Sequence, residues 1–571
     1  MNTESLKKYH PFKPTITLKD RKWPDKTITV PPIWVSTDGR DGNQSLPVPM
    51  DILRKLYFFE TVVSCGFKEI EIGFPSASPT EFNFGRKLIE EKRIPDNVTI
   101  QVLVQAKEDL IIRTLESLVG ARRAIIHLYN STSPAQRRIV FDHNMHQTIS
   151  IAARGVEWIQ KHQEIVSGTE LILEYSPESF SATETNFALH ICQQVMDLWK
   201  PTPDNKIILN LPATVEVSTP NRYADQIEWF IRHLENRESA IISVHTHNDR
   251  GTGIAATELA LLAGAERVEG TLFGNGERTG NADLVTLALN MYTQGVDPKL
   301  DLHNLPAIAE EYQRCTRMPI HPRHPYVGKL VCTAFSGSHQ DAIRKGLRDW
   351  EAGEKKVWEV PYLPFNPTDL GREYQTSIRV NAQSGKGGVA FLLEQEHINP
   401  PKELLEEFSL LVKKHTDEQQ CEATSDELKT MFLGEYDYLE GNNRFPWKLK
   451  DFTITDSGIR TSCKVRFEED CGRNNVVPHE FVGEGNGPIE ALVRSFDEYV
   501  PFQVLDYHTH SLGYGAEASA ISYVKIRNRN DVAWGVGIDT DITQAAVKAT
   551  FSALNRAERI RRSDASKEKG L

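Results

Sequence analysis

Cysteine is sparse in this sequence, and no two cysteines form a C-x-x-C pair. The 571 residues include seven cysteines, an odd number, and they are scattered along the chain. This pattern favours neither a disulfide framework nor a cysteine zinc site. We therefore expect reduced thiols, most of them in the core.

Excess positive charge and long apolar runs are also lacking. The formal net charge is −12 at pH 7, whereas nucleic acids and anionic membranes attract concentrated Lys and Arg. No apolar run approaches the roughly 20 residues of a membrane-spanning helix. The N-terminal segment MNTESLKKYHPFKP resembles neither a signal peptide nor a transit peptide. We expect a cytoplasmic protein with no nucleic-acid or membrane partner.

One pattern recurs between Pro31 and Tyr292, namely a short β-branched apolar run, a loop and an amphipathic stretch. Strands that alternate with helices indicate parallel βαβ units. Eight such units in roughly 260 residues match a (β/α)8 TIM barrel. An open doubly wound sheet is the alternative, but no G-x-G-x-x-G follows the first strand. The predicted strands are Ile33–Ser36, Phe67–Ile72, Ile100–Gln105, Ala124–Leu128, Glu170–Tyr175, Ile207–Leu211, Ala240–Val244 and Arg267–Phe273.

The C-terminal part carries a weak internal repeat. Strand-like segments lead through Gly483-Glu484-Gly485 into a helix at Ile489–Phe496, and others lead through Gly535-Val536-Gly537 into a helix at Thr543–Leu554. We therefore predict an α/β protein with four parts. They are an N-terminal extension (1–30), a catalytic TIM barrel (31–325), mixed helical linker subdomains (326–435) and an α+β regulatory or dimerising domain (436–571).

His245-Thr246-His247 closes the predicted seventh strand. Residues i and i+2 of a strand point to the same face, so both imidazoles can bind one ion. Barrel enzymes place their chemistry at this end of the strands, and the sequence therefore predicts a metal site. The same tripeptide recurs at His508-Thr509-His510, which we interpret as a chance pair that binds no metal.

Arg40 and Asp41 follow the first strand. Asp41 would complete a site of two histidines and one carboxylate with open positions for substrate. Arg40 could stabilise an oxyanion. The alternative is an Asp-Gly turn beside a solvated arginine. Because the first and eighth strands are neighbours only in a closed barrel, the ligands can meet only if the barrel closes.

Further polar residues follow other strands of the barrel. The glycine-rich segment Gly274–Asn281 follows the eighth strand. It could be a phosphate cradle or a flexible turn, and Asn281 offers another oxygen ligand. Glu178, Thr214 and His127 lie at or beyond the ends of strands five, six and four. Singly, each could be an ordinary satisfied polar residue, but together they surround one mouth of the barrel.

These residues, taken in order, resemble the long type of the 2-isopropylmalate synthase family, which is related to homocitrate and citramalate synthases and to hydroxymethylglutaryl-CoA lyase. The resemblance covers nearly the whole chain, and its ordered set of motifs is specific. One departure is Gly39, where the family usually has leucine, and we expect altered loop stiffness there rather than lost chemistry. The segments that carry the resemblance are Ser36–Leu46, Asn210–Glu216, His245–Gly251, Leu272–Asn281, Phe335–Asp341, Arg379–Gly388 and Trp534–Gly537.

The resemblance implies a homodimeric, metal-dependent acyltransferase. Such an enzyme condenses acetyl-CoA with 2-oxoisovalerate in the first committed step of leucine biosynthesis, and leucine inhibits it. The resemblance also implies Mg²⁺, Mn²⁺ or Zn²⁺ as the cofactor, with K⁺ as a candidate activator. The implied site residues are Asp41, His245, His247 and Asn281 for the metal, Arg40, Glu178 and His339 for catalysis, and His127, Ser176 and Thr214 for substrate. The choice of general base between Glu178 and His339 stays open.

The resemblance also places a leucine site in the C-terminal domain, at a dimer interface. Glycine permits close backbone approach to a small ligand, although a plain dimerisation fold with tight turns would also use it. The implied residues are Gly513, Gly515, Gly535, Gly537 and Ile538. The competing functions are a sister synthase for another 2-oxo acid, a metal-dependent hydrolase and a non-catalytic leucine-responsive protein. Hydrolases on this barrel usually carry H-x-H on the first strand, and the intact polar set argues against lost catalysis.

Overall fold

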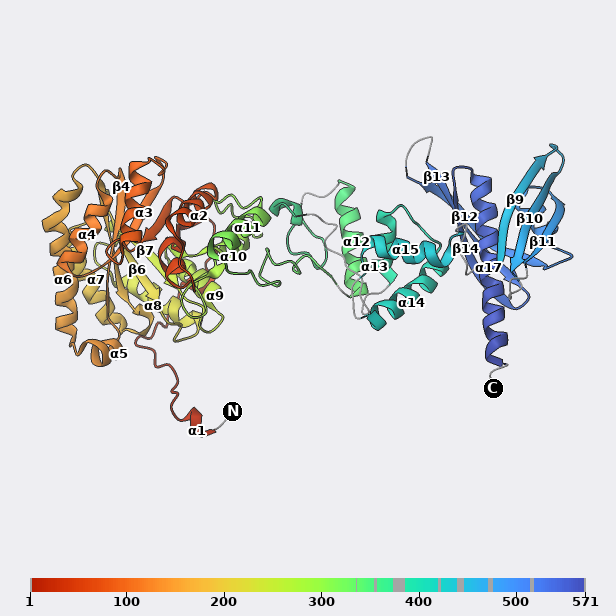
Figure 1. Ribbon diagram of the computed structural model, residues 1–571. Helices are drawn as coiled ribbons and strands as arrows, with labels where there is room; N and C mark the ends of the chain where they lie inside the picture. Colours follow the sequence, from red (N-terminus) through yellow and green to blue (C-terminus); the bar gives the residue numbers. More distant parts are fainter. Residues whose placement is uncertain are drawn as a thin grey trace. The chain divides into compact units, whose positions relative to one another are not determined.

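The computed structural model describes residues 3–334, 336–353, 357–372, 386–419, 423–438, 446–470, 476–513 and 518–568. These residues form two compact units (Figure 1). The first unit comprises residues 1–331 and 367–372, and the second comprises residues 332–366 and 373–571.

The first unit is a closed barrel of eight parallel strands in the order β1 to β8. Closure is direct, because β1 pairs with β8 and places Val35 opposite Glu269. The closed TIM barrel predicted from the sequence is therefore confirmed, and the open sheet is excluded. The strands are β1 Ile33–Ser36, β2 Glu69–Gly73, β3 Thr99–Gln105, β4 Arg123–Ser131, β5 Glu170–Glu178, β6 Ile207–Ala213, β7 Ala240–Thr246 and β8 Arg267–Gly270.

Amphipathic helices surround the strands (Figure 1). In α2, the Asp51 side chain caps the N-terminus by accepting from the Arg54 amide, and Leu56, Phe59 and Val62 are buried. The helices of the unit are α1 Thr3–Leu6, α2 Ile52–Ser64, α3 Pro79–Glu90, α4 Glu108–Leu118, α5 Pro134–Gln136, α6 Met145–His162, α7 Thr185–Trp199, α8 Pro220–His233, α9 Gly253–Ala263, α10 Leu284–Tyr292 and α11 Leu305–Thr316.

Every strand except β1 differs in its bounds from the sequence prediction, and the differences at β8 and β5 affect the site. β8 ends at Gly270, before the predicted Phe273, because the chain turns into a 3-10 segment in which Phe273 has a φ of +58°. That left-handed conformation cannot continue a strand. β5 runs past Tyr175 to Glu178 and so carries Glu178 to the mouth of the barrel.

The N-terminal segment is fastened to helix α8. The Arg21 guanidinium donates to both carboxylate oxygens of Asp225, at 2.6 and 2.7 Å. The backbone amides of Lys22 and Trp23 donate to Glu228. Because Asp225 and Glu228 are buried, these bonds satisfy carboxylates that burial would otherwise destabilise.

The second unit combines helices with two antiparallel three-stranded sheets, in the orders β11-β10-β9 and β12-β13-β14. Strand β13 separates two cores: Ile521 and Tyr523 pack with the helices, whereas Val524 and Ile526 pack with the other sheet. The elements are α12 Gly337–Glu351, α13 Lys386–Gln395, α14 Lys402–Gln419, α15 Ser425–Tyr436, β9 Trp447–Asp456, β10 Thr461–Asp470, β11 Val476–Gly485, α16 Pro488–Ser495, β12 Phe502–Leu512, β13 Ser519–Asn528, β14 Asp531–Asp539 and α17 Ile542–Glu568.

Close packing of a helix against each sheet explains the glycines of the internal repeat. A Cβ atom at Gly483 would lie 2.3 Å from the Ala491 carbonyl oxygen in α16. A Cβ atom at Gly535 would lie 2.2 Å from the Ala549 carbonyl oxygen in α17. Each G-x-G strand therefore lets one helix backbone lie directly on its sheet, once in each half of the module.

Among the described residues, no helix combines the length and the apolarity needed to span a bilayer. Five of the cysteines lie in the described part of the chain, and all five are buried.

Candidate metal centre and active site

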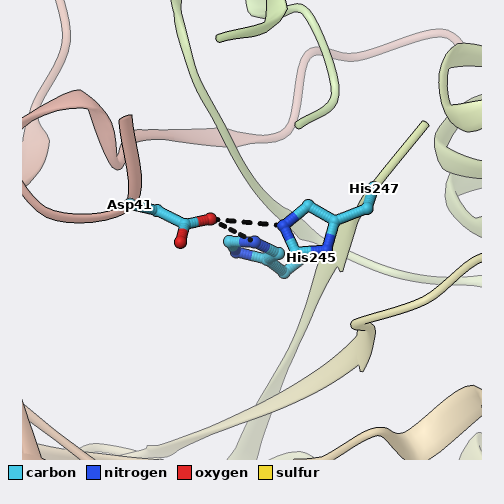
Figure 2. A group of neighbouring side chains, drawn as sticks. All are labelled: Asp41, His245 and His247. Atoms are coloured by element: carbon cyan, nitrogen blue, oxygen red, sulfur yellow. Dashed lines mark hydrogen bonds and ion pairs between the residues drawn. The ribbon is translucent and has the colours of Figure 1, made fainter. Parts of the chain in front are cut away.

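Asp41, His245 and His247 converge at the carboxyl end of the barrel strands (Figure 2). Asp41 lies in a π-helical turn, Asp38–Gly42, that follows β1. His245 lies near the end of β7 and His247 directly after it. Oδ2 of Asp41 is 3.3 Å from Nε2 of each histidine, and all three residues are buried. This arrangement leaves three ligand atoms facing one point.

The Nδ1 atom of each imidazole lies within hydrogen-bond distance of an acceptor oxygen. Nδ1 of His245 is 3.0 Å from a Glu269 carboxylate oxygen, and Nδ1 of His247 is 2.5 Å from the backbone carbonyl oxygen of Thr214. With Nδ1 of each ring engaged in this way, Nε2 is the atom of each ring that a metal ion would bind. Such backing partners fix the tautomer of metal-binding histidines.

Asn281 supplies an independent observation that a cation fits here. Its side chain is 2% exposed, and neither amide atom has a hydrogen-bond partner among the described residues. A backbone bridge places Asn281 beside His247. Buried polar atoms are rarely left unpaired. Two imidazoles, a carboxylate and an orphan amide oxygen fit Mg²⁺, Mn²⁺ or Zn²⁺.

The electrostatics of the cluster agree with a cation site. Burial alone would lower the pKa of His245, but Asp41 and Glu269 outweigh it and raise that pKa to about 9. Burial would likewise raise the pKa of Asp41, yet Arg40 and the two histidines hold it well below its usual range. The same carboxylates that attract a proton to His245 would attract a cation.

The cluster opens into a cavity of about 250 Å³. Arg40 is fixed beside it, because Nη1 lies 2.8 Å from Asp41 Oδ1 and Nε lies 2.6 Å from Glu71 Oε2. The cavity is lined by Arg40, Asp41, Gln44, Leu103, His127, Tyr129, Ser176, Glu178, Asn210, Pro212, Thr214, His245, His247, Glu277 and Arg278.

Four further residues from the sequence hypothesis, Glu178, Thr214, His127 and Ser176, line the same cavity. Glu178 accepts a hydrogen bond from the Ser131 hydroxyl. Thr214 Oγ1 accepts from the Ser179 amide at 2.9 Å. Nε2 of His127 lies 2.7 Å from the Ser176 hydroxyl oxygen.

The remaining predicted residues lie in the second unit. His339 is exposed on α12 and stacks on the Tyr362 ring, with centroids 3.9 Å apart. Gly535, Gly537 and Ile538 lie on β14, and Gly513 follows β12. Gly515, Phe335 and the segment 379–385 fall outside the described residues.

Position 39 is sterically constrained. A Cβ atom there would lie 2.7 Å from the Glu71 carbonyl oxygen and 3.1 Å from Ile72 Cα. The turn that carries Arg40 and Asp41 therefore lies directly on β2, and glycine permits this approach.

The sequence reasoning missed the buried polar and charged residues inside the barrel. Glu71, Gln101, Glu174, Arg267 and Glu269 are all 0% exposed, inside the barrel. A signal was present, because Glu69-Ile70-Glu71 and Arg267-Val268-Glu269 place charges at i and i+2 of strands in a barrel. Residues with this spacing share one face.

Three family models match the chain. An HMGL-like model matches residues 31–311. A model described as "Alpha-isopropylmalate synthase, post-catalytic domain-like" matches residues 329–394. The "LeuA allosteric (dimerisation) domain" model matches residues 422–558.

Among solved structures, a hydroxymethylglutaryl-CoA lyase from Pseudomonas aeruginosa is 17% identical, with a TM-score of 0.43, and covers 52% of this chain and 96% of that one. An HMG-CoA lyase from Bacillus subtilis is 18% identical, with a TM-score of 0.42, and covers 51% of this chain and 96% of that one.

Full-length relatives are far more similar. A 2-isopropylmalate synthase from Pseudomonas syringae pv. tomato is 52% identical over 559 residues, which is 98% of each chain. One from Parafrankia sp. is 51% identical over 97% of this chain and 98% of its own length. One from Pseudomonas putida (strain W619) is 53% identical over 98% of each chain. This chain, with its closed barrel, its buried cluster at the barrel mouth and its C-terminal α+β domain, belongs to the 2-isopropylmalate synthase family.

Proposed function

We propose that the barrel condenses acetyl-CoA with 2-oxoisovalerate to give 2-isopropylmalate and CoA. The observation that carries this proposal is the convergence of Asp41, His245 and His247 beside the unpartnered Asn281. Identity of 51–53% to synthases over nearly the full length supports the choice of reaction.

The proposed ligands of a divalent cation are Asp41, His245, His247 and Asn281. When bound, a Mg²⁺, Mn²⁺ or Zn²⁺ ion acts as a Lewis acid that polarises the ketone of the 2-oxo acid. K⁺ is a further candidate activator.

Arg40 would stabilise the negative charge that develops on the ketone oxygen. Its guanidinium is anchored by Glu71 and Asp41, so it needs no reorganisation during the reaction. Thr214 Oγ1 already accepts from the Ser179 amide, which leaves its hydroxyl proton for the carboxylate of the substrate. His127 and Ser176 would contact the side chain of the 2-oxo acid.

A base must remove a proton from the acetyl methyl group, so that the resulting carbanion attacks the ketone carbon. Glu178 lines the cavity, and His339 is the second candidate. Water then cleaves the thioester, which releases CoA as the free thiol. Glu178 is held by the Ser131 hydroxyl, and this hydrogen bond would orient its carboxylate.

We further propose that leucine inhibits the enzyme at the C-terminal domain of a homodimer. The match to the allosteric (dimerisation) domain model supports this role. The proposed contacts are Gly513, Gly515, Gly535, Gly537 and Ile538. The proposed division of the chain remains 1–30, 31–325, 326–435 and 436–571.

The test is a thiol-release assay with acetyl-CoA and each of 2-oxoisovalerate, pyruvate and 2-oxoglutarate. Each substrate is assayed after chelation, after addition of Mg²⁺, Mn²⁺ or Zn²⁺, and with leucine. We expect metal-dependent, leucine-sensitive turnover that is fastest with 2-oxoisovalerate. Faster turnover of pyruvate or 2-oxoglutarate would indicate a sister synthase instead, and turnover that survives chelation would contradict the metal role.

A further inference from the structure

A hydrogen-bonded layer lies inside the barrel beneath the metal centre. Nη2 of Arg267 donates to the Gln101 side chain at 2.6 Å. Because a guanidinium only donates, the acceptor must be the amide oxygen. The Gln101 NH₂ group therefore faces the other way, toward Glu269 Oε1 at 3.0 Å and Glu71 Oε1 at 3.2 Å. Arg267 thus fixes the orientation of the amide.

The position of Glu71 determines the tautomer of His127. Nδ1 of His127 lies 3.0 Å from Glu71 Oε1 and 3.2 Å from Gln101 Nε2, whose two N–H groups already have Glu269 and Glu71 as acceptors. An unprotonated Nδ1 at this distance would set its lone pair against a carboxylate lone pair. His127 must therefore carry a proton on Nδ1 and donate it to Glu71. The Nε2 atom of the neutral imidazole is then an acceptor.

This tautomer determines the direction of the next hydrogen bond. Nε2 of His127 is 2.7 Å from Ser176 Oγ, so the serine hydroxyl must donate to the histidine. The next oxygen near Nε2, from Glu174, is farther away at 3.5 Å. Ser176 Oγ also accepts from Asn210 Nδ2 at 3.0 Å, and it keeps one lone pair.

Asn210 contributes no spare donor either. Its NH₂ group donates to Ser176 Oγ at 3.0 Å and to Glu269 Oε2 at 3.2 Å. Its Oδ1 atom is buried and has no hydrogen-bond partner among the described residues. His127, Ser176 and Asn210 therefore offer the cavity no free N–H or O–H group, and the accepting lone pair of Ser176 Oγ remains.

We propose that Glu71 is a positioning residue that, through the tautomer of His127 and the hydroxyl of Ser176, excludes 2-oxo acids whose side chain ends in a carboxylate. This inference rests on the proposed function, which places the substrate side chain at His127 and Ser176. A carboxylate side chain has only acceptors and would be buried against acceptors without a hydrogen bond. An alkyl side chain forms no hydrogen bonds in water and so loses none there, and a substrate hydroxyl group can donate to Ser176 Oγ.

The wild-type enzyme gives the first test, with two pairs of substrates of matched shape. Oxaloacetate should have a kcat/KM at least about 1000-fold below that of 4-methyl-2-oxopentanoate, which has the same branching. Oxaloacetate turnover is measured as citrate, so that pyruvate from decarboxylation is not counted. 2-Oxo-4-hydroxybutanoate should stay within about tenfold of 2-oxopentanoate. If 2-oxo-4-hydroxybutanoate is excluded as strongly as oxaloacetate, the proposed direction of the hydrogen bond between Ser176 and His127 is wrong.

Glu71→Gln gives the second test, because it reverses the network. Arg40 Nε must face an oxygen, so the new NH₂ group would face Nδ1 of His127. His127 would then donate from Nε2 to Ser176, whose proton would turn toward the substrate. We expect lower kcat with every substrate, since Arg40 loses a charged partner. We also expect the kcat/KM ratio of oxaloacetate to 4-methyl-2-oxopentanoate to rise at least about tenfold.

Glu69→Gln is the matched control. Glu69 lies two residues earlier on β2 and accepts from Arg267 Nε at 2.7 Å, and no hydrogen bond joins it to His127. In Glu69→Gln, the kcat/KM ratio of oxaloacetate to 4-methyl-2-oxopentanoate should stay within about threefold of the wild-type ratio. Adding Ser176→Ala to Glu71→Gln should abolish the rise in this ratio. Equal changes in both Gln variants, or no change in Glu71→Gln, would overturn the inference. Activity with 2-oxoisovalerate tests the proposed function separately.

Discussion

His245 and Glu269 are joined by a buried hydrogen bond of 3.0 Å between Nδ1 and Oε2. Glu269 comes from β8, the strand next to β7, and it also accepts from Gln101 and Asn210. A single carboxylate therefore sets the tautomer of a proposed metal ligand and anchors the polar layer beneath it.

Glu269→Gln should weaken metal binding. An amide can still accept from His245, but it lacks the charge, and its NH₂ group would face the donors Arg267 or Gln101. Loss of such a backing partner typically reduces metal affinity by about 10–100-fold. Calorimetric titration of the metal-free protein with Mn²⁺ measures the effect, with Glu69→Gln as the control. Unchanged Mn²⁺ affinity in Glu269→Gln would contradict this role.

His247→Ala should remove both metal binding and turnover. The chain contains its own control, because His508 belongs to an identical His-Thr-His tripeptide on β12 and is exposed. We expect kcat to fall at least about 1000-fold in His247→Ala and to remain at the wild-type value in His508→Ala. Equal losses in the two variants would show that the effect is general rather than local.

Gly535→Ala should destabilise the C-terminal module. The added methyl group would lie 2.2 Å from backbone atoms of Ala549 and Ala553 in α17, so the helix must shift. Overpacking of this kind costs about 1–3 kcal/mol. Gly434→Ala is the control, because nothing lies within 4 Å of that Cβ in α15 and alanine is the better helix former. Calorimetry should show a lower unfolding temperature for Gly535→Ala and no decrease for Gly434→Ala.

The stability of the same module should depend on pH through the carboxyl group of Asp437. Burial raises the pKa of this carboxyl to about 6, from the ordinary 3.8. The folded state therefore binds the proton more tightly than the unfolded state does. The stabilisation is complete below about pH 4 and is lost as the pH rises through 6.

Asp437→Asn mimics the neutral acid and should be more stable than wild type at pH 8, by up to about 3 kcal/mol. Asp539→Asn should show the opposite sign. Burial would raise the pKa of Asp539, but the ion pair with Lys548 outweighs it and lowers that pKa. Unfolding midpoints at pH 5 and pH 8 give both comparisons, and parallel shifts in the two variants would contradict the assignment.

The periodic part of the fold was predictable, whereas local backbone geometry and interior polarity were not. Alternating strands and helices predicted the closed barrel, and the H-x-H motif with Asp41 predicted the cluster that the structure brings together. The end of β8 was missed, because the left-handed turn at Phe273 depends on tertiary packing. Glu71 and Gln101 were missed, because their hydrogen-bond partners come from strands distant in sequence.

The packing role of Gly535 and Gly537 also could not be predicted from the sequence. The sequence hypothesis attributed these glycines to close approach by a ligand. The structure supplies a packing reason, since α17 lies directly on both positions. Leucine contact at these residues thus remains a proposal that rests on the family resemblance.

Because β1 pairs directly with β8, binding of the proposed metal ion should report that synthesis and folding of the barrel are complete. A ribosome must release residues well beyond His247 before the first strand gains its final neighbour, which begins at Arg267. Until β1 pairs with β8, Asp41 and the two histidines belong to a sheet that has not closed into a barrel, and they could not bind one ion together. Metal retention by truncated chains should therefore appear abruptly, once β8 is included, and not accumulate strand by strand.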